Sequence, residues 1–239
     1  MAHHPEIILS CEHAGNHVPE EFQYLFVADF DLLNGHRGWD IGAFELAKEA
    51  AHRLRTCLFY TTITRLLVEN NRTIGHPELF SLITRRLDHG QKAKILQSYY
   101  HPFQNALSTA VIAAIERAPL VIHLSIHTFT PYLNDKMRNA DVGLLYNPKH
   151  TAEKDFCINC GRQLKQTFPY LRIRRNYPYR GNTDSIVAHF RKKYYHRGYL
   201  GIEIEVNQRI PLGDQANWPI FRAAFCRCLL AVISKTSEF

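Results

Sequence analysis

An almost unbroken apolar run near the middle of the chain, residues 120–126, most strongly limits how this sequence can fold. The run is far shorter than the ~20 residues of a membrane span. Its length and continuity are typical of a strand that is buried on both faces. Such a strand lies inside a largely parallel sheet that helices cover on both sides. The run therefore predicts an α/β protein, with His127 placed where the strand ends.

The rest of the chain alternates between extended and helical patterns, without repeats or a linker rich in Gly, Ser or Pro. This alternation predicts one domain over residues 1–239, folded as a three-layer α/β/α sandwich around a mixed, mostly parallel sheet. Ligands of such sheets bind beyond the carboxyl ends of the strands. Extended segments are expected at 7–11, 57–63, 66–69, 120–126, 142–146, 171–174 and 199–206; helices are expected at 44–56, 91–118 (interrupted at Pro102), 151–168, 182–196 and from 217 onward.

Composition excludes several classes of protein. Of the 239 residues, 46% are hydrophobic and 21% are charged, which excludes a disordered chain, a collagen-like repeat and a coiled coil. The first residues lead directly into an apolar segment without the basic and long apolar regions of a signal peptide. We therefore expect a soluble, cytoplasmic protein that has no membrane partner.

Six cysteines are too few and too scattered to staple a chain of this length. Cys157 and Cys160 have zinc-knuckle or redox spacing, and Cys226 with Cys228 is the one pair that could complete a Cys₄ site. Two thiols separated by one residue on a helix point to different faces, which makes that completion poor geometry. Free, reduced and mostly buried thiols are the favoured interpretation.

The net charge of +7 permits nucleic-acid binding only if the basic residues cluster on one surface. The densest basic runs, 171–175 and 191–193, lie inside alternating or helical patterns, so solvated faces explain them. We therefore predict no nucleic-acid partner. A small acidic substrate is a second reason for a chain to concentrate arginine.

Four reactive side chains fall at predicted strand ends or next to a helix start: His13, Asp40, His127 and Glu205. A single histidine at a strand end is most often a satisfied polar residue, but several at one sheet edge are harder to dismiss. Two imidazoles and a carboxylate suit zinc with an open coordination position, and a further glutamate can act as a base. A carboxylate such as Glu205 in an apolar central strand needs a partner or a metal.

Arginines fall in the same region of the chain. Arg65 precedes an apolar segment that ends in Asn71 and Arg72. An Asn–Arg pair after a strand can hold a carboxylate, because the guanidinium fork matches it with two hydrogen bonds. A surface-turn arginine is the alternative interpretation of Arg72.

Two further polar residues, His123 and Glu203, stand in the predicted central strands on the same faces as the proposed site residues. They either support the site from behind or form a buried polar pair, and the sequence does not separate these readings.

Six segments share a further property. They are 12–19 (EHAGNHVP), 39–43 (WDIGA), 64–72 (TRLLVENNR), 124–131 (LSIHTFTP), 176–181 (NYPYRG) and 202–208 (IEIEVNQ). In order from about residue 10 to about residue 210, these segments resemble the N-formylglutamate amidohydrolase-like family. No single segment is decisive, but six in register are specific.

The resemblance implies a zinc-carboxypeptidase-like fold and one Zn²⁺ per chain. Relatives use a His-x-x-Glu pair and a later histidine as ligands, but here Asn16 stands three residues after His13. The resemblance to the formylglutamate branch therefore implies His13, Asp40 and His127 as ligands. The His-x-x-Glu spacing of His17 and Glu20 is the alternative.

The resemblance also implies roles in the cleavage of an N-acyl amino acid such as N-formylglutamate. Glu205 is expected to be the base and Arg65 to stabilise the oxyanion. Asn71 and Arg72 are expected to bind the α-carboxylate of this small acidic substrate. Arg180 is either a clamp for a side-chain carboxylate or a surface loop charge. The rival functions are a hydrolase of the same fold with another N-acyl or peptide substrate, and a basic binding module without catalysis.

Overall fold

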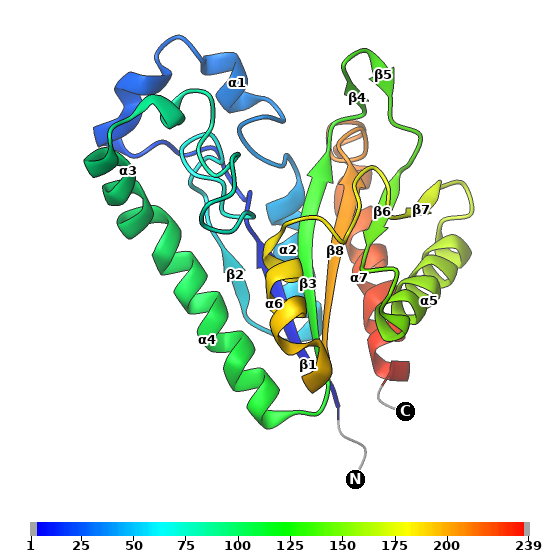
Figure 1. Ribbon diagram of the computed structural model, residues 1–239. Coiled ribbons are helices and arrows are strands. Elements are labelled where there is room, and N and C mark those ends of the chain that lie inside the picture. Colours follow the sequence, from blue (N-terminus) through cyan, green and yellow to red (C-terminus); the bar gives the residue numbers. More distant parts are fainter. Residues whose placement is uncertain (1–3, 237–239) are drawn as a thin grey trace.

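The computed structural model describes residues 4–236 and contains a six-stranded sheet (Figure 1). All neighbouring strands are parallel except β6 and β8, which are antiparallel, so the sheet is mixed and mostly parallel as predicted. The strand order is β2-β1-β3-β8-β6-β7. The bounds are β1 (Glu6–Cys11), β2 (Leu58–Tyr60), β3 (Val121–Phe129), β6 (Val142–Leu145), β7 (Ile173–Arg175) and β8 (Tyr199–Asn207).

Helices cover both faces of the sheet, which completes the predicted three-layer α/β/α sandwich (Figure 1). On one face, α4 (His101–Arg117) and α6 (Ile186–Tyr194) bury apolar side chains against β1, β3 and β8. On the other face, α2 (Ala43–Leu54), α5 (Thr151–Thr167) and α7 (Asn217–Thr236) form the larger apolar core.

A third apolar cluster lies beside the sheet rather than on its faces. The helical pattern over 91–118 is interrupted near Pro102, as predicted. A π-helical turn precedes this proline, and α4 begins one residue before it. The elements outside the three layers are η1 (Glu20–Phe26), α1 (Phe30–Asn34), η2 (Thr84–Arg86), α3 (His89–Ile95), η3 (Leu96–Tyr100), η4 (Tyr195–Arg197) and the hairpin β4 (Tyr132–Leu133)–β5 (Lys136–Met137).

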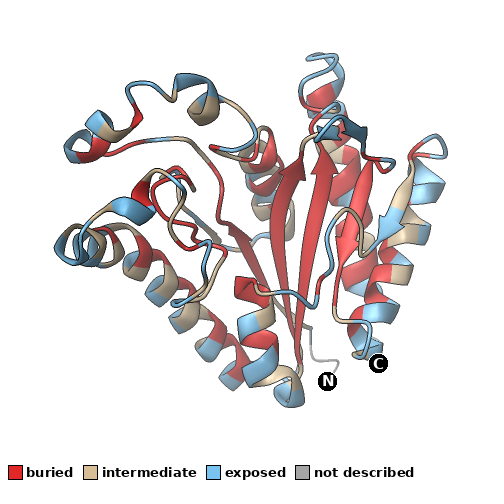
Figure 2. Cartoon of the chain, turned by 45° about the horizontal axis from the view of Figure 1, so that its top comes forward, coloured by how far each residue is buried: buried red, intermediate tan, exposed pale blue. Residues whose placement is uncertain are grey.

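The two central strands, β3 and β8, are buried along all nine residues of each (Figure 2). This confirms that the apolar run at 120–126 marks a strand covered on both faces. Because β3 and β8 are parallel and in register from Val121 and Tyr199 onward, their carboxyl ends coincide, with His127 beside Glu205.

One predicted strand was wrong, and one predicted helix begins later than expected. Residues 66–69 form a turn instead of a strand, in which the Leu67 backbone N–H donates to the Thr64 carbonyl at 3.0 Å. The apolar side chains of this turn fill the third cluster, which mimics the pattern of a buried strand. Helix α6 begins at Ile186 and not at 182, because the Ser185 hydroxyl caps it by accepting from the Ala188 N–H at 3.2 Å.

The structure leaves all six cysteines as free thiols, and five of them are buried. Burial raises the pKa of Cys157 and of Cys160, which keeps both thiols protonated. Within residues 4–236, no helix is both long enough and apolar enough to cross a bilayer.

Candidate active site

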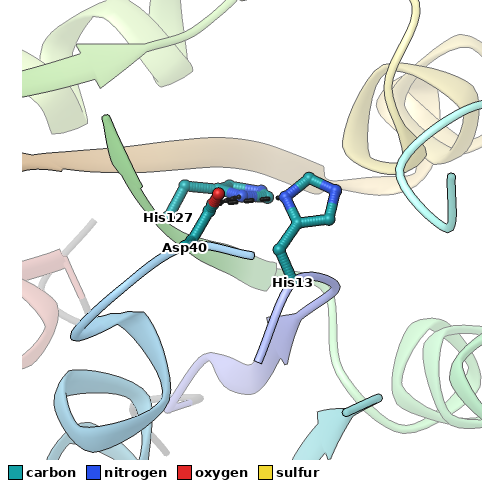
Figure 3. Close-up of side chains that lie close together, drawn as sticks. All are labelled: His13, Asp40 and His127. Atoms are coloured by element: carbon teal, nitrogen blue, oxygen red, sulfur yellow. Dashed lines mark hydrogen bonds and ion pairs between the residues drawn. The ribbon is translucent and has the colours of Figure 1, made fainter. Parts of the chain in front are cut away.

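Three side chains from separate parts of the chain meet at the carboxyl edge of the sheet (Figure 3). His13 follows β1, His127 lies on the neighbouring parallel strand β3, and Asp40 precedes α2. Their potential ligand atoms all lie within 4.8 Å of one another. All three residues are buried, each with 3% or less of its surface exposed. The structure therefore brings together the three residues that the resemblance implies as ligands.

The backbone around Asp40 holds that carboxylate against the sheet. The Asp40 backbone N–H donates to the His13 carbonyl at 3.1 Å. Two residues later, Gly42 adopts φ +88°, and a Cβ there would lie 2.5 Å from the Pro211 Cβ. Only glycine fits this left-handed turn, which lets α2 begin directly after Asp40.

Asp40 lies between the two imidazoles, on the Nδ1 side of each. Its Oδ2 atom is 3.2 Å from Nδ1 of His13 and 2.9 Å from Nδ1 of His127. The opposite nitrogens face other carboxylates: Nε2 of His13 contacts Glu69, and Nε2 of His127 is 3.1 Å from Glu12. A carboxylate behind each imidazole fixes the ring and its tautomer, which is how metal-binding histidines are commonly supported.

These contacts shift several pKa values in opposite directions. Burial by itself would raise the pKa of Asp40, but the two histidines hold it well below its usual range. Burial by itself would lower the pKa of His127, but hydrogen bonds to Asp40 and Glu12 raise it well above its usual range. Burial by itself would raise the pKa of Glu12, but the hydrogen bond and charge of His127, together with hydrogen bonds to Ser10 and Ser125, lower it to about 2.

The site buries more acidic than basic groups. Glu12, Asp40, Glu69 and Glu205 are at most 6% exposed. Among residues 4–236, the one arginine that forms ion pairs with them is Arg65, which is 30% exposed. A divalent cation between the three ligands would offset this surplus of buried negative charge. The donor set, two imidazoles and a carboxylate, is also one that zinc accepts, so the residues present fit a metal ion.

Glu205 stands on β8 directly beside His127 of β3. It is 5% exposed, and its Oε2 atom is buried without a hydrogen-bond partner among the described residues. Burial raises its pKa to about 8. An unpartnered carboxylate oxygen in a central strand is costly, so this side chain is poised for a group that the chain itself does not supply.

Arg65 links the carboxylates on the exposed side of the site. Its Nε atom donates to Glu69 at 2.7 Å, and its Nη1 atom donates to Asp40 at 3.4 Å. Burial by itself would lower the pKa of Arg65, but the charges of Glu69 and Asp40, together with the hydrogen bond to Glu69, raise it. Arg65 therefore remains a fixed positive charge next to the ligand cluster.

Asn71 and Arg72 have different surroundings. The Asn71 side chain accepts from the Ile186 N–H at 2.9 Å, and its Nδ2 atom lies 3.4 Å from Nε2 of His127. Arg72 is 25% exposed and uses Nη1 to donate to the Asp184 carbonyl at 2.6 Å. Its Nε atom is buried without a partner among the described residues.

A family model described as N-formylglutamate amidohydrolase matches residues 6–211. The chain belongs to the N-formylglutamate amidohydrolase family. This places it among hydrolases that act on C–N bonds other than peptide bonds. Among curated proteins, no sequence matches the chain.

Solved structures show the same fold at low sequence identity. A gene product from Agrobacterium tumefaciens is 22% identical, with a TM-score of 0.82; the match covers 98% of this chain and 93% of that one. The N-formylglutamate amidohydrolase from Ralstonia eutropha JMP134 is 17% identical, with a TM-score of 0.75; the match covers 98% and 94% of the two chains. Both likenesses extend across almost the whole length of the proteins.

The segment at 176–181, one of the family-like segments, forms a loop next to β6. The Asn176 side chain accepts from the Tyr146 and Gly181 N–H groups at 3.0 and 3.1 Å, which closes the loop on itself. Arg180 lies exposed on this loop. Its role as a clamp stays a prediction.

Other candidates lie apart from the ligand cluster. His17 and Glu20 are both exposed and do not join it. Asn16 instead donates to the Leu33 carbonyl at 3.1 Å and so ties the loop after β1 to α1. His123 and Glu203 do not pair with each other; His123 contacts Ser10 and Tyr199, and Glu203 accepts from Ser185.

Sequence reasoning missed the carboxylates behind the histidines, Glu12 and Glu69. Both belong to family-like segments, Glu12 immediately before His13 and Glu69 two residues before Asn71. The sequence signal that could have identified them is a carboxylate next to an apolar segment, because a buried carboxylate needs a hydrogen-bond or ion-pair partner. Nothing in the sequence marked Arg138, a buried arginine that follows β5.

Proposed function

We propose that this protein hydrolyses the amide bond of an N-acyl amino acid such as N-formylglutamate, with one zinc ion held by His13, Asp40 and His127. The observation that carries the proposal is the convergence of these three ligands, with a carboxylate behind each imidazole. Family membership supplies the reaction class. A bound zinc ion would supply Lewis acidity, which polarises an amide carbonyl and acidifies water.

Glu205 is the base of the proposed reaction. It accepts a proton from the attacking water while the oxygen of that water forms a bond to the acyl carbon. It then gives the proton to the amine nitrogen as the C–N bond breaks, which releases the acid and the free amino acid. Its support is the unpartnered Oε2 atom beside His127.

Arg65 stabilises the negative charge that develops on the acyl oxygen. Its guanidinium is held in place by Glu69 and Asp40, so it needs no rearrangement when the charge appears. As the partly exposed member of the cluster, it is also reachable by a substrate that arrives from solvent.

Asn71, Arg72 and Arg180 bind the acidic groups of the substrate. Asn71 is supported by its contact with His127, and Arg72 by its unpartnered Nε atom. Arg180 is exposed and attracts the anionic substrate as it approaches.

Metal content and amide hydrolysis test this proposal together. Purified protein is expected to hold about one zinc per chain and to release the amino acid from N-formylglutamate. A chelator should abolish turnover, and zinc should restore it. A panel of N-formyl, N-acetyl and peptide substrates identifies the acyl group and separates this activity from that of a carboxypeptidase.

His127→Ala should lose the metal, and His150→Ala is the matched control, because His150 lies outside the ligand cluster. Zinc retained by His127→Ala would refute the ligand set. Turnover that persists in a metal-free protein would refute the reaction proposed here.

A further inference from the structure

A buried hydrogen-bonded group lies directly behind His127. Nε2 of His127 is 3.1 Å from Oε2 of Glu12 and 2.7 Å from Oγ of Ser125. The Ser125 hydroxyl donates to the same Glu12 oxygen at 2.7 Å. Since this donation uses the one proton of the hydroxyl, Ser125 accepts from Nε2 of His127, and this nitrogen carries a proton. Nδ1, the atom beside Asp40, is therefore the nitrogen left for a metal.

The hydrogen bonds continue from Glu12 into the core, away from the candidate site. A hydrogen bond from Ser10 is one of the causes that lower the pKa of Glu12. Oγ of Ser10 is 2.8 Å from Nε2 of His123, and Nδ1 of His123 is 2.6 Å from the Tyr199 hydroxyl. We call the six side chains the buried network, and each is at most 2% exposed: Ser10, Glu12, His123, Ser125, His127 and Tyr199.

The donors of the buried network are all directed towards Glu12. Burial lowers the pKa of His123 to about 4 despite the charge of Glu12, so its ring is neutral at pH 7 and has a single N–H. The hydroxyl of Ser10 uses its one proton for Glu12, so Nε2 of His123 donates to Oγ of Ser10. Nδ1 of His123 then accepts from the Tyr199 hydroxyl. Three residues in succession therefore support the charge of one fully buried carboxylate.

The sheet brings the members of the buried network onto one face. Ser10 of β1 and Ser125 of β3 are partners in register, and His123 is two residues before Ser125. Gly201 of β8 lies directly beside His123. A Cβ at Gly201 would lie 2.9 Å from Cε1 of Tyr199, so the glycine leaves space for the ring whose hydroxyl reaches His123.

We propose that His123 is a positioning residue that fixes the ring of the candidate ligand His127 and so raises the zinc affinity of the site. It acts through Ser10, which orients Glu12. This inference rests on the proposed function, in which His127 binds zinc. An ionised carboxylate behind an imidazole holds the ring in place and makes it a more basic ligand. A core that only needed filling would be served by apolar side chains, because each buried polar group costs desolvation free energy.

Zinc affinity, measured by competition with a chromophoric chelator, tests this inference without catalysis. Ser10→Ala separates His123 from Glu12 and should weaken zinc binding by about tenfold, the lower end of the cost of losing an outer partner. His123→Leu should cause a similar loss. His123→Gln should recover part of the affinity, because its amide N–H can donate to Ser10 in place of Nε2. Wild-type affinity in both Ser10→Ala and His123→Leu would overturn the inference.

Thr84→Val is the matched control, because it removes another fully buried hydroxyl that lies outside the buried network. The Thr84 hydroxyl donates to the Leu66 carbonyl at 3.3 Å, in the apolar cluster beside the sheet. Its loss should lower the melting temperature and leave zinc affinity unchanged. If Ser10→Ala behaved in the same way, with lower stability and full zinc affinity, the buried network would only support the core, and the inference would fail.

Nuclear magnetic resonance of zinc-free protein with ¹⁵N-labelled histidines provides a measurement that needs neither metal nor turnover. At pH 7, His123 should carry its one N–H on Nε2. The Nε2–H signal of His127 should shift in Ser10→Ala and stay in place in Thr84→Val. A proton on Nδ1 of His123, or an unmoved His127 signal in Ser10→Ala, would overturn the inference. If the wild-type protein binds no zinc, the proposed function fails, and these signals still decide whether His123 positions His127.

Discussion

Two buried polar clusters lie against the same central strand, β8, and differ in whether their own atoms satisfy them. The closed cluster, near the start of the strand, consists of Glu153, Arg191 and the backbones of Gly181 and Gly201. The open cluster, near the end of the strand, consists of His13, Asp40, His127 and Glu205.

In the closed cluster, each charge has a partner inside the chain. Oε1 of Glu153 accepts from Arg191 at 2.7 Å and from the Gly201 N–H at 3.0 Å, and Oε2 accepts from the Asn147 N–H at 2.8 Å. In the open cluster, Oε2 of Glu205 has no partner among the described residues. Glu153 and Glu205 are both buried but differ in what their burial indicates. A cluster whose polar atoms are all hydrogen-bonded holds elements of the fold together, whereas one with an unpartnered atom indicates a binding site for a ligand.

The largest expected effect concerns the open cluster. Glu205→Gln keeps the shape of the side chain but removes its ability to accept a proton, so turnover should fall by about 10²–10⁴-fold. Zinc content should stay the same, because Glu205 is not one of the three proposed ligands. Steady-state kinetics together with metal analysis check both statements. Unchanged turnover would remove Glu205 from the role of base.

The same variant should not destabilise the fold. The buried Oε2 atom of Glu205 has no hydrogen-bond partner among the described residues, so the folded protein does not compensate the burial of a charge there. A neutral amide is therefore tolerated there, and the melting temperature of Glu205→Gln should be equal to or above that of the wild type. A large drop in melting temperature would mean that Glu205 belongs with the closed cluster.

The opposite pattern is expected for the closed cluster. Arg191→Met leaves the buried charge of Glu153 without its partner, which should lower the free energy of unfolding by about 3–5 kcal/mol. Denaturant titration measures this loss. The folded fraction should keep its zinc and its KM.

The double variant Glu153→Gln with Arg191→Met sharpens this test. Removing both charges should recover part of the lost stability, because no unpaired charge remains in the core. If the double variant were as unstable as the sum of the two single variants, the pair would not be coupled.

Sequence patterns predict the strands and helices of the three-layer sandwich well. The apolar run at 120–126 is almost continuous, and the pattern of 44–56 keeps the helical period throughout. Both segments form the expected elements, β3 and α2. Residues 66–69 were wrongly predicted as a strand, because a short apolar run is expected both for a buried strand and for a turn buried in an apolar cluster beside the sheet.

The convergence of His13, Asp40 and His127 was predictable, because parallel strands bring their carboxyl ends together and the family resemblance singled out Asp40. Arg138 was not, because nothing in its local sequence distinguishes a buried arginine from an exposed one such as Arg174. Its position depends on a loop 40 residues later, which carries Tyr179 and is held by Asn176.

Arg72 lies between the two types of cluster, and its replacement is the smallest and most discriminating test. Nη1 is engaged by the Asp184 carbonyl just before α6, as in the closed cluster, whereas Nε is buried without a partner among the described residues, as in the open one. Arg72→Lys retains the charge but loses the fork. If Arg72 binds the α-carboxylate, KM should rise by about tenfold, equivalent to about 1.4 kcal/mol, with kcat nearly unchanged.

Arg174→Lys, the same replacement at an exposed arginine, is the matched control and should leave KM and the melting temperature as they are. A melting temperature that falls in Arg72→Lys while KM stays constant would assign Arg72 to the support of the loop before α6. Carboxylate recognition would then depend on Asn71 and on arginines outside this turn. A rise in KM without loss of stability assigns Arg72 to the open cluster. That result would mean that the two hydrogen bonds of its guanidinium matter for a bound ligand and not for the stability of the chain.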